Sequence, residues 1–248
     1  MIRIRGLKKR LGRKQVLDGV DLDIPTGRTV VVIGRSGTGK SVLLKHVIGL
    51  MTPDEGAIEV DGREVVGLKE REMNEVRKRF GLLFQGGALF DSLTVGENVG
   101  LPMREHTSLP DAEVRRRVAE RLDWVGLNGV EDMKPASLSG GMRKRVGLAR
   151  AIAMDPAYIL YDEPTTGLDP IMSDVINRLI RSLQQRIGVT SVVVTHDMAS
   201  AYHVGDELAM LHEGRVVFTG TPDEARQTTD PLVRQFIEGS SEGPIRPA

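Results

Sequence analysis

The stretch Gly34-Arg35-Ser36-Gly37-Thr38-Gly39-Lys40-Ser41 matches GxxxxGK[ST], the pattern of a loop that wraps around phosphate groups. An apolar run, Thr29 to Ile33, precedes it and predicts a strand, and the apolar-rich segment Val42 to Leu50 follows it and predicts a helix. The glycines let backbone amides converge on phosphates, and the helix N-terminus adds the positive end of its dipole. This context of strand, loop and helix predicts an α/β fold that binds a nucleotide.

Two side chains of this loop carry specific roles. Lys40 is expected to reach the β- and γ-phosphates, and the Ser41 hydroxyl is expected to coordinate Mg²⁺. The loop therefore predicts both a triphosphate and a metal ion.

Four apolar runs share a further property, because each ends in a residue that can take part in chemistry. They are Thr29 to Ile33 before Gly34, Phe80 to Phe84 before Gln85, Tyr158 to Tyr161 before Asp162 and Glu163, and Ser191 to Thr195 before His196. Such runs are typical of buried parallel strands, and ligands of open α/β sheets bind at the carboxyl ends of the strands. We therefore expect these ends to meet in one site.

The acidic pair indicates hydrolysis at that site. Two adjacent carboxylates at the end of a buried strand are costly unless a cation or a reaction uses them. Asp162 suits an outer ligand of Mg²⁺, and Glu163 is predicted to be the general base that orients and deprotonates the attacking water. His196 is expected to contact the γ-phosphate and hold that water.

Composition narrows the class of protein. The 248 residues suffice for one large domain, and Lys plus Arg equals Asp plus Glu at 34 each, which disfavours nucleic acid as a partner. The chain has no Cys, in agreement with a reducing, cytoplasmic compartment. No stretch approaches the roughly 20 apolar residues of a membrane span, so a role at a membrane would require another chain to do the spanning.

Elements of other kinds surround the predicted parallel strands. The turn Asp61-Gly62 predicts a hairpin of Gly56 to Val60 with Arg63 to Val66, and a turn at Gly214 predicts another of Leu208 to Leu211 with Arg215 to Thr219. Both hairpins are expected to form an antiparallel layer beside the parallel sheet. Helical spacing replaces strand patterns between about residues 93 and 155, notably in Asp111 to Val125 and Met142 to Met154, and predicts an inserted helical subdomain.

The chain end has a different composition. Residues 239–248 are rich in Gly, Ser and Pro and predict a tail without its own core, leaving residues 1–238 as the folded domain. Our hypothesis is that this tail contributes to contact between two copies of the chain.

The segment Leu138-Ser139-Gly140-Gly141-Met142 resembles the signature motif of the ATP-binding cassette (ABC) family. The phosphate loop, Gln85, this segment, the acidic pair, Gly167-Leu168-Asp169-Pro170 and His196 occur in the family's order, over residues 1–238. The resemblance implies an α/β fold with a P-loop NTPase (ABC ATPase) core of mainly parallel sheet, an antiparallel β subdomain and an inserted helical subdomain. It also implies ATP hydrolysis with Mg²⁺ by two copies that enclose two ATP molecules.

The resemblance assigns roles by position. Gln85 is expected to touch Mg²⁺ and to sense a membrane partner, His196 to be the switch histidine, and Asp169 to belong to a loop that crosses the dimer. Ser139, Gly140 and Gly141 are expected to contact the ATP of the opposite subunit, since a Ser N-cap and two glycines at a helix start form a second anion site. The residues expected to bind ATP within the chain are Gly34, Arg35, Ser36, Gly37, Thr38, Gly39, Lys40, Ser41 and Val42.

One position departs from the family. Leu11 stands where an aromatic residue usually stacks on adenine, and stacking of this kind is worth about 1–3 kcal/mol in nucleic-acid complexes. We therefore expect Leu11 to affect the nucleotide affinity of the site and its preference for adenine over guanine, but not hydrolysis.

Within the family, the phosphate loop, residues 84–95, Met142-Arg143-Lys144-Arg145 and the ending Val233-Arg234-Gln235-Phe236 are similar to the ATPases of MCE-type lipid transporters, which include the maintenance-of-lipid-asymmetry system. That similarity implies an integral membrane permease, an MCE-type lipid-binding protein, a possible small accessory subunit and a phospholipid cargo, with the chain held at the inner face of the cell membrane. The residues after Gln85 suit either a permease-binding groove or the core of the helical subdomain.

Two other functions stay open. One is an ABC transporter for another cargo, such as amino acids, metals or drugs, because the ATPase does not touch the cargo. The other is a soluble ABC protein that acts on DNA or ribosomes, which the single cassette, the absence of Cys and the balanced charge disfavour.

Overall fold

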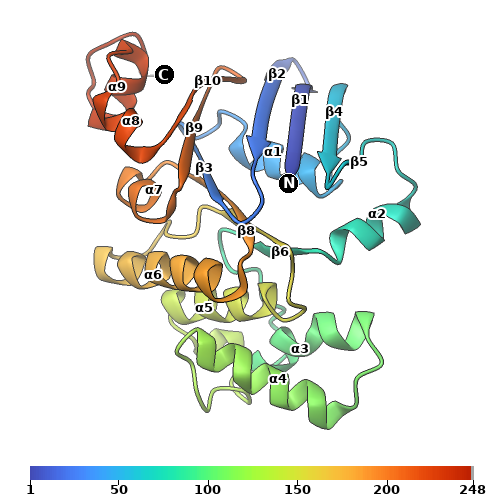
Figure 1. The fold of residues 1–248 in the computed structure, drawn as a ribbon. Coiled ribbons are helices and arrows are strands. Elements are labelled where there is room, and N and C mark those ends of the chain that lie inside the picture. Colours follow the sequence, from blue (N-terminus) through green and yellow to red (C-terminus); the bar gives the residue numbers. More distant parts are fainter. Residues whose placement is uncertain (247–248) are drawn as a thin grey trace.

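The four apolar runs that predict parallel strands lie together in a six-stranded sheet in the computed structural model, which describes residues 1–246 (Figure 1). The strand order is β10-β9-β3-β8-β7-β6, and every neighbouring pair is parallel except β9 with β10. The strands are β3 (Thr29–Ile33), β6 (Phe80–Leu83), β7 (Tyr158–Asp162), β8 (Thr190–Thr195), β9 (Glu207–His212) and β10 (Arg215–Gly220).

Both faces of this sheet are buried, which explains why its strands are apolar without alternation. In β3, Val31 and Ile33 belong to one hydrophobic cluster with residues of the helices on one side of the sheet. Val30 and Val32 point the other way, into a second cluster with the first helix and the N-terminal strands. The sheet therefore separates two cores and holds its strand ends in fixed positions.

The second sheet is the predicted antiparallel layer. Its order is β2-β1-β4-β5, with β1 (Ile2–Leu11), β2 (Lys14–Ile24), β4 (Glu55–Val60) and β5 (Arg63–Glu64). The Asp61-Gly62 turn joins β4 to β5 with both residues at positive φ, 52° and 79°. Strand β5 is shorter than predicted because the Glu64 carboxylate accepts hydrogen bonds from the backbone amides of Ile58 and Val66 at 3.1 and 2.8 Å.

The second predicted hairpin lies elsewhere, so its assignment to the antiparallel layer is wrong. Strand β9 pairs in parallel with β3 inside the six-stranded sheet, and β10 forms the sheet's edge. Residues 208–211 are buried throughout, whereas β10 alternates between exposed and half-buried residues. A strand buried on both faces belongs inside a sheet, and this physical difference separates the two hairpins.

Helices surround the sheets and fill the segment between β6 and β7. That segment holds α3 (Val95–His106), α4 (Asp111–Trp124), a short 3-10 helix (Pro135–Ser137) and α5 (Gly140–Ala151), and lies at the opposite end of the molecule from β1, β2 and β4 (Figure 1). The other helices are α1 (Lys40–Val47), α2 (Glu70–Arg77), α6 (Pro170–Ile187), α7 (Met198–Val204), α8 (Pro222–Gln227) and α9 (Pro231–Glu238). The boundaries of the helical subdomain, about 93–155, stay a prediction.

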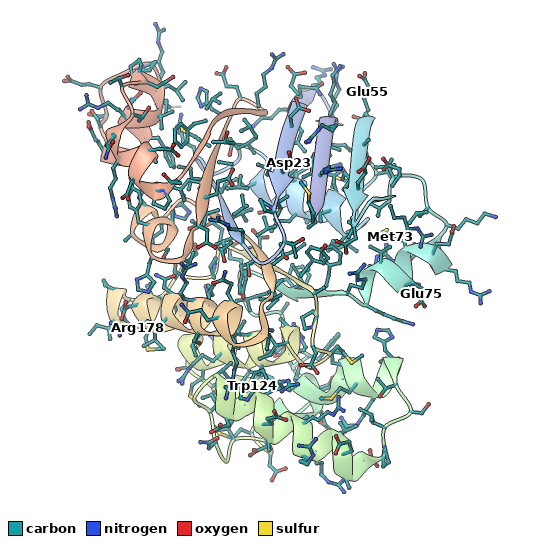
Figure 2. All side chains as sticks on the ribbon, viewed as in Figure 1. Asp23, Glu55, Met73, Glu75, Trp124 and Arg178 are labelled. Atoms are coloured by element: carbon teal, nitrogen blue, oxygen red, sulfur yellow. The ribbon has the colours of Figure 1, made fainter. Side chains whose placement is uncertain are left out.

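Two cation–π contacts on one tryptophan ring connect α4 to α6. The Trp124 ring, labelled in Figure 2, has the guanidinium carbons of Arg121 and Arg186 at 4.1 and 4.3 Å from its centroid. Such contacts contribute about 0.5–2 kcal/mol each. The only tryptophan of the chain therefore helps to hold the inserted helices against the core.

Two helices end earlier than their apolar patterns predict. Helix α1 stops at Val47 because Gly49 adopts a left-handed φ of 62°, where a side chain would meet the Met73 side chain at 2.9 Å. Helix α5 stops at Ala151, and Asp155 has a φ of 49° directly before Pro156, which disfavours a helical conformation in the residue before it.

The tail packs back onto its own chain over the residues that the structure describes. Ile245 is buried. The Gln235 side chain accepts a hydrogen bond from the Ile245 amide at 2.6 Å and donates one to the Ile245 carbonyl at 2.9 Å. Residues 247–248 of the predicted tail lie outside the described residues. A contribution of the tail to dimer contact stays a prediction.

No helix within residues 1–246 combines the length and apolarity needed to cross a bilayer.

Gly81 of β6 offers a test of this packing. A Cβ atom at this position would lie 2.1 Å from the Ala151 carbonyl oxygen at the end of α5, so Gly81→Ala forces the helix and the sheet apart. We expect a loss of about 1–3 kcal/mol or more in the free energy of unfolding, measured by urea denaturation. Gly86→Ala is the control, because a Cβ there meets nothing within 4 Å; equal stability of both variants would contradict the packing.

Candidate nucleotide site

The phosphate loop lies between the carboxyl end of β3 and the first turn of α1, as its sequence predicts. Gly34 has a φ of 154°, and a Cβ there would lie 2.4 Å from the Leu211 carbonyl oxygen. Gly39 caps α1 with a φ of 104° and would place a Cβ 2.9 Å from the Val16 carbonyl oxygen. Glycine is therefore required at both positions by conformation and by space.

Lys40 is buried at the centre of the loop, with only 5% of its surface exposed. Its ammonium donates to the carbonyls of Gly34 and Arg35 at 2.8 and 3.1 Å and lies 3.4 Å from Oε1 of Glu163. Burial lowers the pKa of Lys40, while the nearby carboxylates of Glu163 and Asp162 oppose this shift. The cation is thus held facing the carboxylate at the end of β7.

Ser41 and Asp162 meet beneath the loop. The Ser41 hydroxyl donates to Oδ1 of Asp162 at 2.7 Å, which joins the start of α1 to the end of β7. A hydroxyl and a carboxylate at this distance are oxygen ligands of the kind that Mg²⁺ binds. The donor set therefore fits the ion predicted for this site.

Glu163 and His196 form a second contact at the strand ends. Nδ1 of His196 lies 2.9 Å from Oε2 of Glu163, and the Thr166 hydroxyl donates to the same oxygen at 3.2 Å. Glu163 is nearly buried, whereas His196 is exposed, and Glu163 has a left-handed φ of 50°. The carboxylate is therefore held between Lys40, Thr166 and His196 by contacts from three segments of the chain.

These residues line one cavity of about 450 Å³. Its walls are Leu11, Val16, Ser36, Gly37, Gly39, Lys40, Ser41, Val42, Gln85, Glu163 and His196. The polar strand ends predicted to meet do so, and Asp162 lies beside them through its bond to Ser41. Leu11 and Val16 form an aliphatic wall of this cavity. Leu11 is the residue that stands where the family usually has an aromatic residue to stack on adenine.

Gly34, Arg35 and Thr38 belong to the phosphate loop but do not line the cavity. The carbonyls of Gly34 and Arg35 turn towards Lys40, and Thr38 donates from its hydroxyl to the Arg35 carbonyl at 2.9 Å. The Arg35 guanidinium points away from the cavity and donates to the carbonyl of Arg246 at 2.9 Å. These residues shape the loop, and the tail touches it from outside.

The signature residues do not reach this cavity. The Ser139 hydroxyl caps α5 by accepting from the Met142 amide at 3.2 Å, and Ser139 and Gly140 are exposed. Asp169 caps α6 in the same way, accepting from the Met172 amide at 3.0 Å, and is exposed as well. In a single chain the cavity beside the phosphate loop is therefore separate from the exposed start of α5.

Lys144 is a candidate site residue that the sequence pattern did not single out. It lies in a run of cations, Arg143-Lys144-Arg145, that suggests a solvated face, yet only 5% of its surface is exposed. Its ammonium donates to the backbone carbonyls of Glu163, Pro164 and Thr166. A signal was available, since the helical period places Lys144 on the face of α5 that also buries Gly141 and Leu148.

Comparison with known protein families agrees with this geometry. Residues 17–166 match the family model described as "ABC transporter". The "Probable ribonucleotide transport ATP-binding protein mkl" of Mycobacterium leprae is 43% identical over 98% of this chain and 70% of its own length. The "Intermembrane phospholipid transport system ATP-binding protein MlaF" of Haemophilus influenzae is 41% identical over 99% of this chain and 93% of its own.

Solved structures extend the match to the fold. The dimeric "ATP-binding cassette MJ0796 bound to ADP and Pi" superposes with a TM-score of 0.83 at 33% identity, covering 90% of this chain and 99% of that one. The protein cbiO1 from Clostridium perfringens, "Part of the ABC transporter complex cbiONQ", gives 0.83 at 28% identity, covering 94% and 93%. The phosphate loop, the acidic pair and these likenesses lead to one conclusion: the chain belongs to the ABC transporter family and is one of its ATP-binding, ATP-hydrolysing subunits.

Proposed function

We propose that two copies of this chain close around two Mg-ATP molecules and drive phospholipid transport through a separate membrane permease. The observation that carries the dimer is the division of the anion-binding groups. The phosphate loop opens into the cavity, whereas Ser139 and Gly140 face solvent at the start of another helix. A second copy would supply the missing half of each site. A related cassette is dimeric with ADP and Pi bound, which supports this arrangement.

Each polar group of the cavity then has a role in hydrolysis. The loop amides and Lys40 bind the phosphates, and Glu163 acts as general base on the attacking water. His196 holds Glu163 and the water from one side through its Nδ1 contact. Ser41, Gln85 and Asp162 would hold Mg²⁺, which neutralises charge on the phosphates.

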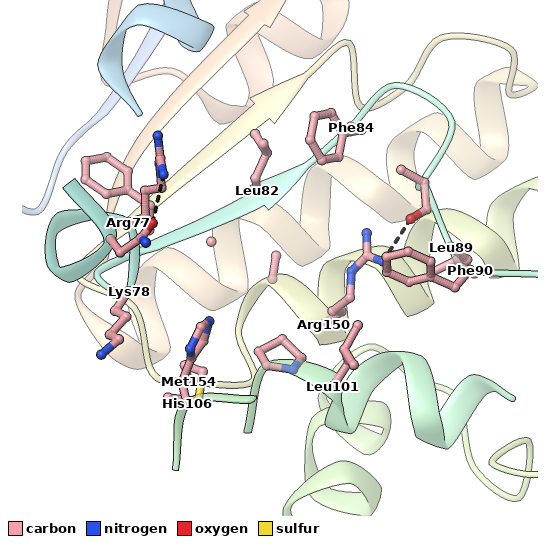
Figure 3. A pocket seen from close by; sticks show the side chains of 16 residues that line it. Arg77, Lys78, Leu82, Phe84, Leu89, Phe90, Leu101, His106, Arg150 and Met154 are labelled. Atoms are coloured by element: carbon pink, nitrogen blue, oxygen red, sulfur yellow. Dashed lines mark hydrogen bonds between the residues drawn. The ribbon is translucent and has the colours of Figure 1, made fainter. Parts of the chain in front are cut away.

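A groove beside the site suits the permease. Its volume is about 660 Å³, and exposed Phe84 and Phe90 with Leu101 contribute apolar surface (Figure 3). Arg150 donates to the carbonyls of Gly87 and Ala88 at 2.9 and 2.8 Å and so holds the segment that follows Gln85. Because Gln85 lines the nucleotide cavity and its neighbours line the groove, one short segment connects the two.

This groove supports one of the two readings of the residues after Gln85. Leu89 is partly buried against the core, as expected for subdomain packing, but 54% of Phe90 is exposed. A large exposed apolar side chain at a groove is typical of a protein-binding surface. We therefore assign the groove to the permease, which would hold the chain at the inner face of the cell membrane.

The lipid cargo rests on similarity to MlaF, whose name specifies phospholipid transport and whose match covers almost all of both chains. An MCE-type lipid-binding protein and a small accessory subunit belong to the same proposal. The relatives named for ribonucleotide transport make a nucleotide cargo the second candidate.

The exposed signature can be tested without unfolding its helix. Ser139→Asp keeps a good N-cap but places a carboxylate against the partner's ATP phosphates. Like charges across an interface cost several kcal/mol, so in the Glu163→Gln background we expect ATP-driven dimerisation to weaken about 100-fold or more. Analytical ultracentrifugation with Mg-ATP measures this, with Glu163→Gln alone as the control. Unchanged dimerisation would remove Ser139 from the partner's site.

The transport role is tested by capture from native membranes. Tagged Glu163→Gln chain, with Mg-ATP, is recovered from detergent-solubilised membranes, and the bound proteins and lipids are identified by mass spectrometry. A permease with an MCE-type protein and phospholipid is the expected result. A different permease would retain the ATPase and overturn the lipid cargo, and recovery without any membrane protein would favour a soluble ABC function.

Two matched variants locate the permease contact. Phe90→Asp places a charge in the groove, whereas Val217→Asp places one at an exposed apolar residue on β10. We expect only Phe90→Asp to lose the permease while both dimerise with Mg-ATP. Equal capture by the two variants would contradict the groove assignment.

A further inference from the structure

A buried lysine holds the backbone that carries the proposed general base. The Lys144 ammonium donates to the carbonyl oxygens of Glu163, Pro164 and Thr166 at 3.2, 2.6 and 2.8 Å. Three donors and three acceptors match, so the hydrogen-bonding capacity of the ammonium is filled. Its burial lowers the pKa of Lys144 to about 8, a shift that the nearby Glu163 opposes. Burying a cation is costly, which indicates that these contacts have a specific use.

The Glu163 amide donates to the Val194 carbonyl of β8 at 2.9 Å, but the conformation of the 163–166 turn needs further support. Glu163 has a left-handed φ of 50°, a conformation that a residue with a side chain keeps only when its surroundings impose it. The next residue, Pro164, has no backbone N–H to donate, and the backbone amide of Thr166 makes a long 3.3 Å bond to the Glu163 carbonyl. The carbonyls of this turn therefore point together, and a cation at their centre stabilises that arrangement.

The same turn fixes the Glu163 side chain. Thr166, whose carbonyl Lys144 binds, also donates from its hydroxyl to Oε2 of Glu163. Loss of the ammonium would release both the backbone of Glu163 and the Thr166 contact with its carboxylate. Lys144 does not itself line the nucleotide cavity, and the lining residue to which it hydrogen-bonds is Glu163, so its effect passes through Glu163.

We propose that Lys144 is a positioning residue for ATP hydrolysis, which holds Glu163 in place by clamping the three carbonyls of the 163–166 turn. The clamp also connects the 163–166 turn to the signature segment, because Lys144 lies on α5, five residues after its N-cap Ser139. The proposal rests on the proposed role of Glu163 as general base.

The test compares turnover with binding in Lys144→Met. Met has similar length but cannot donate, so we expect kcat to fall about 10- to 100-fold, as small misplacements of catalytic groups do, with nucleotide Kd changed by less than about threefold. Lys144→Gln restores two N–H donors and should recover part of kcat. Arg145→Met is the control on the same helix, because Arg145 bonds the carbonyls of Val125 and Gly126 instead; its kcat should match the wild type.

A second comparison shows whether Lys144 acts through Glu163. Lys144→Met is combined with Glu163→Gln, and the residual rate is measured in single turnovers. If the clamp serves only to position Glu163, the double variant hydrolyses ATP no more slowly than Glu163→Gln alone. An unchanged kcat in Lys144→Met, or an equal further loss in the Glu163→Gln background, would overturn the proposal.

Both comparisons distinguish the proposed role of Lys144 from the proposed role of Glu163 as general base. Full hydrolysis by Glu163→Gln alone would remove Glu163 as the base, whatever Lys144 does. An inactive Glu163→Gln with a fully active Lys144→Met would overturn only the clamp. If Lys144→Met does not fold, Lys144→Gln takes its place in both comparisons, with an expected loss of about 3- to 10-fold and the same two overturning results.

Discussion

Glu163→Gln is expected to lower kcat for ATP hydrolysis about 10²- to 10⁴-fold, the range attributed to a general base, while Mg-ATP still binds. The substitution keeps the size of the side chain and leaves the phosphate loop intact, but the amide cannot accept a proton from water. Because the proposed dimer closes around intact ATP, a variant that binds ATP without cleaving it should accumulate as an ATP-bound dimer. Phosphate release measures kcat, and sedimentation with and without Mg-ATP measures the dimer.

Glu213→Gln is the matched control for that experiment. Glu213 is also a glutamate with a left-handed φ, 47°, in the turn between β9 and β10, and its side chain is exposed. It therefore shares the chemical change and the backbone conformation but does not line the nucleotide cavity. Turnover should be normal in Glu213→Gln. Wild-type turnover in Glu163→Gln would show that another group activates the water.

Lys40→Ala should instead weaken nucleotide binding itself. Hydrogen bonds to charged groups contribute about 1.5–3 kcal/mol, which corresponds to an increase of about 10- to 150-fold in Kd. The lysine also donates to the carbonyls of Gly34 and Arg35, so the substitution removes two contacts within the loop. Binding is measured by titration with a fluorescent ATP analogue, and thermal unfolding shows that the variant is folded.

Lys45→Ala controls for loss of a cation from the same helix. Lys45 is exposed, lies on α1 five residues after Lys40 and does not line the nucleotide cavity. Its Kd for the nucleotide should remain at the wild-type value. Normal binding by Lys40→Ala would mean that the loop is not the phosphate-binding element.

Local patterns predicted the core of the fold well. Strand β3 has the predicted limits, and β6, β7 and β8 differ from the predicted runs by one residue at one end. These strands could be predicted from the sequence because burial on both faces requires uninterrupted apolar residues. The order of polar residues after them also indicated a shared site, since parallel strands end at the same edge of their sheet.

Patterns that depend on partners were less informative. The turn at Gly214 correctly indicates a hairpin, but only pairing with β3 places β9 inside the parallel sheet. The long strands β1 and β2 were not predicted, although Ile2 and Ile4 are buried and alternate with exposed Arg3 and Arg5. Lys144 shows the same limit, because the helical period places it on the buried face of α5 but does not reveal the carbonyls of the 163–166 turn that it binds.

The amino-acid sequence by itself determined the family of this protein and predicted its chemistry, through the loop of Gly34 to Ser41, the acidic pair and their order along the chain. These features are local, because glycine freedom, side-chain charge and strand hydrophobicity act over a few residues. Only the tertiary structure decided which groups touch. It set the pairing of Ser41 with Asp162, the contact of His196 with Glu163 and the clamp by Lys144, because such contacts join segments that only the packing of the sheet and its helices brings together.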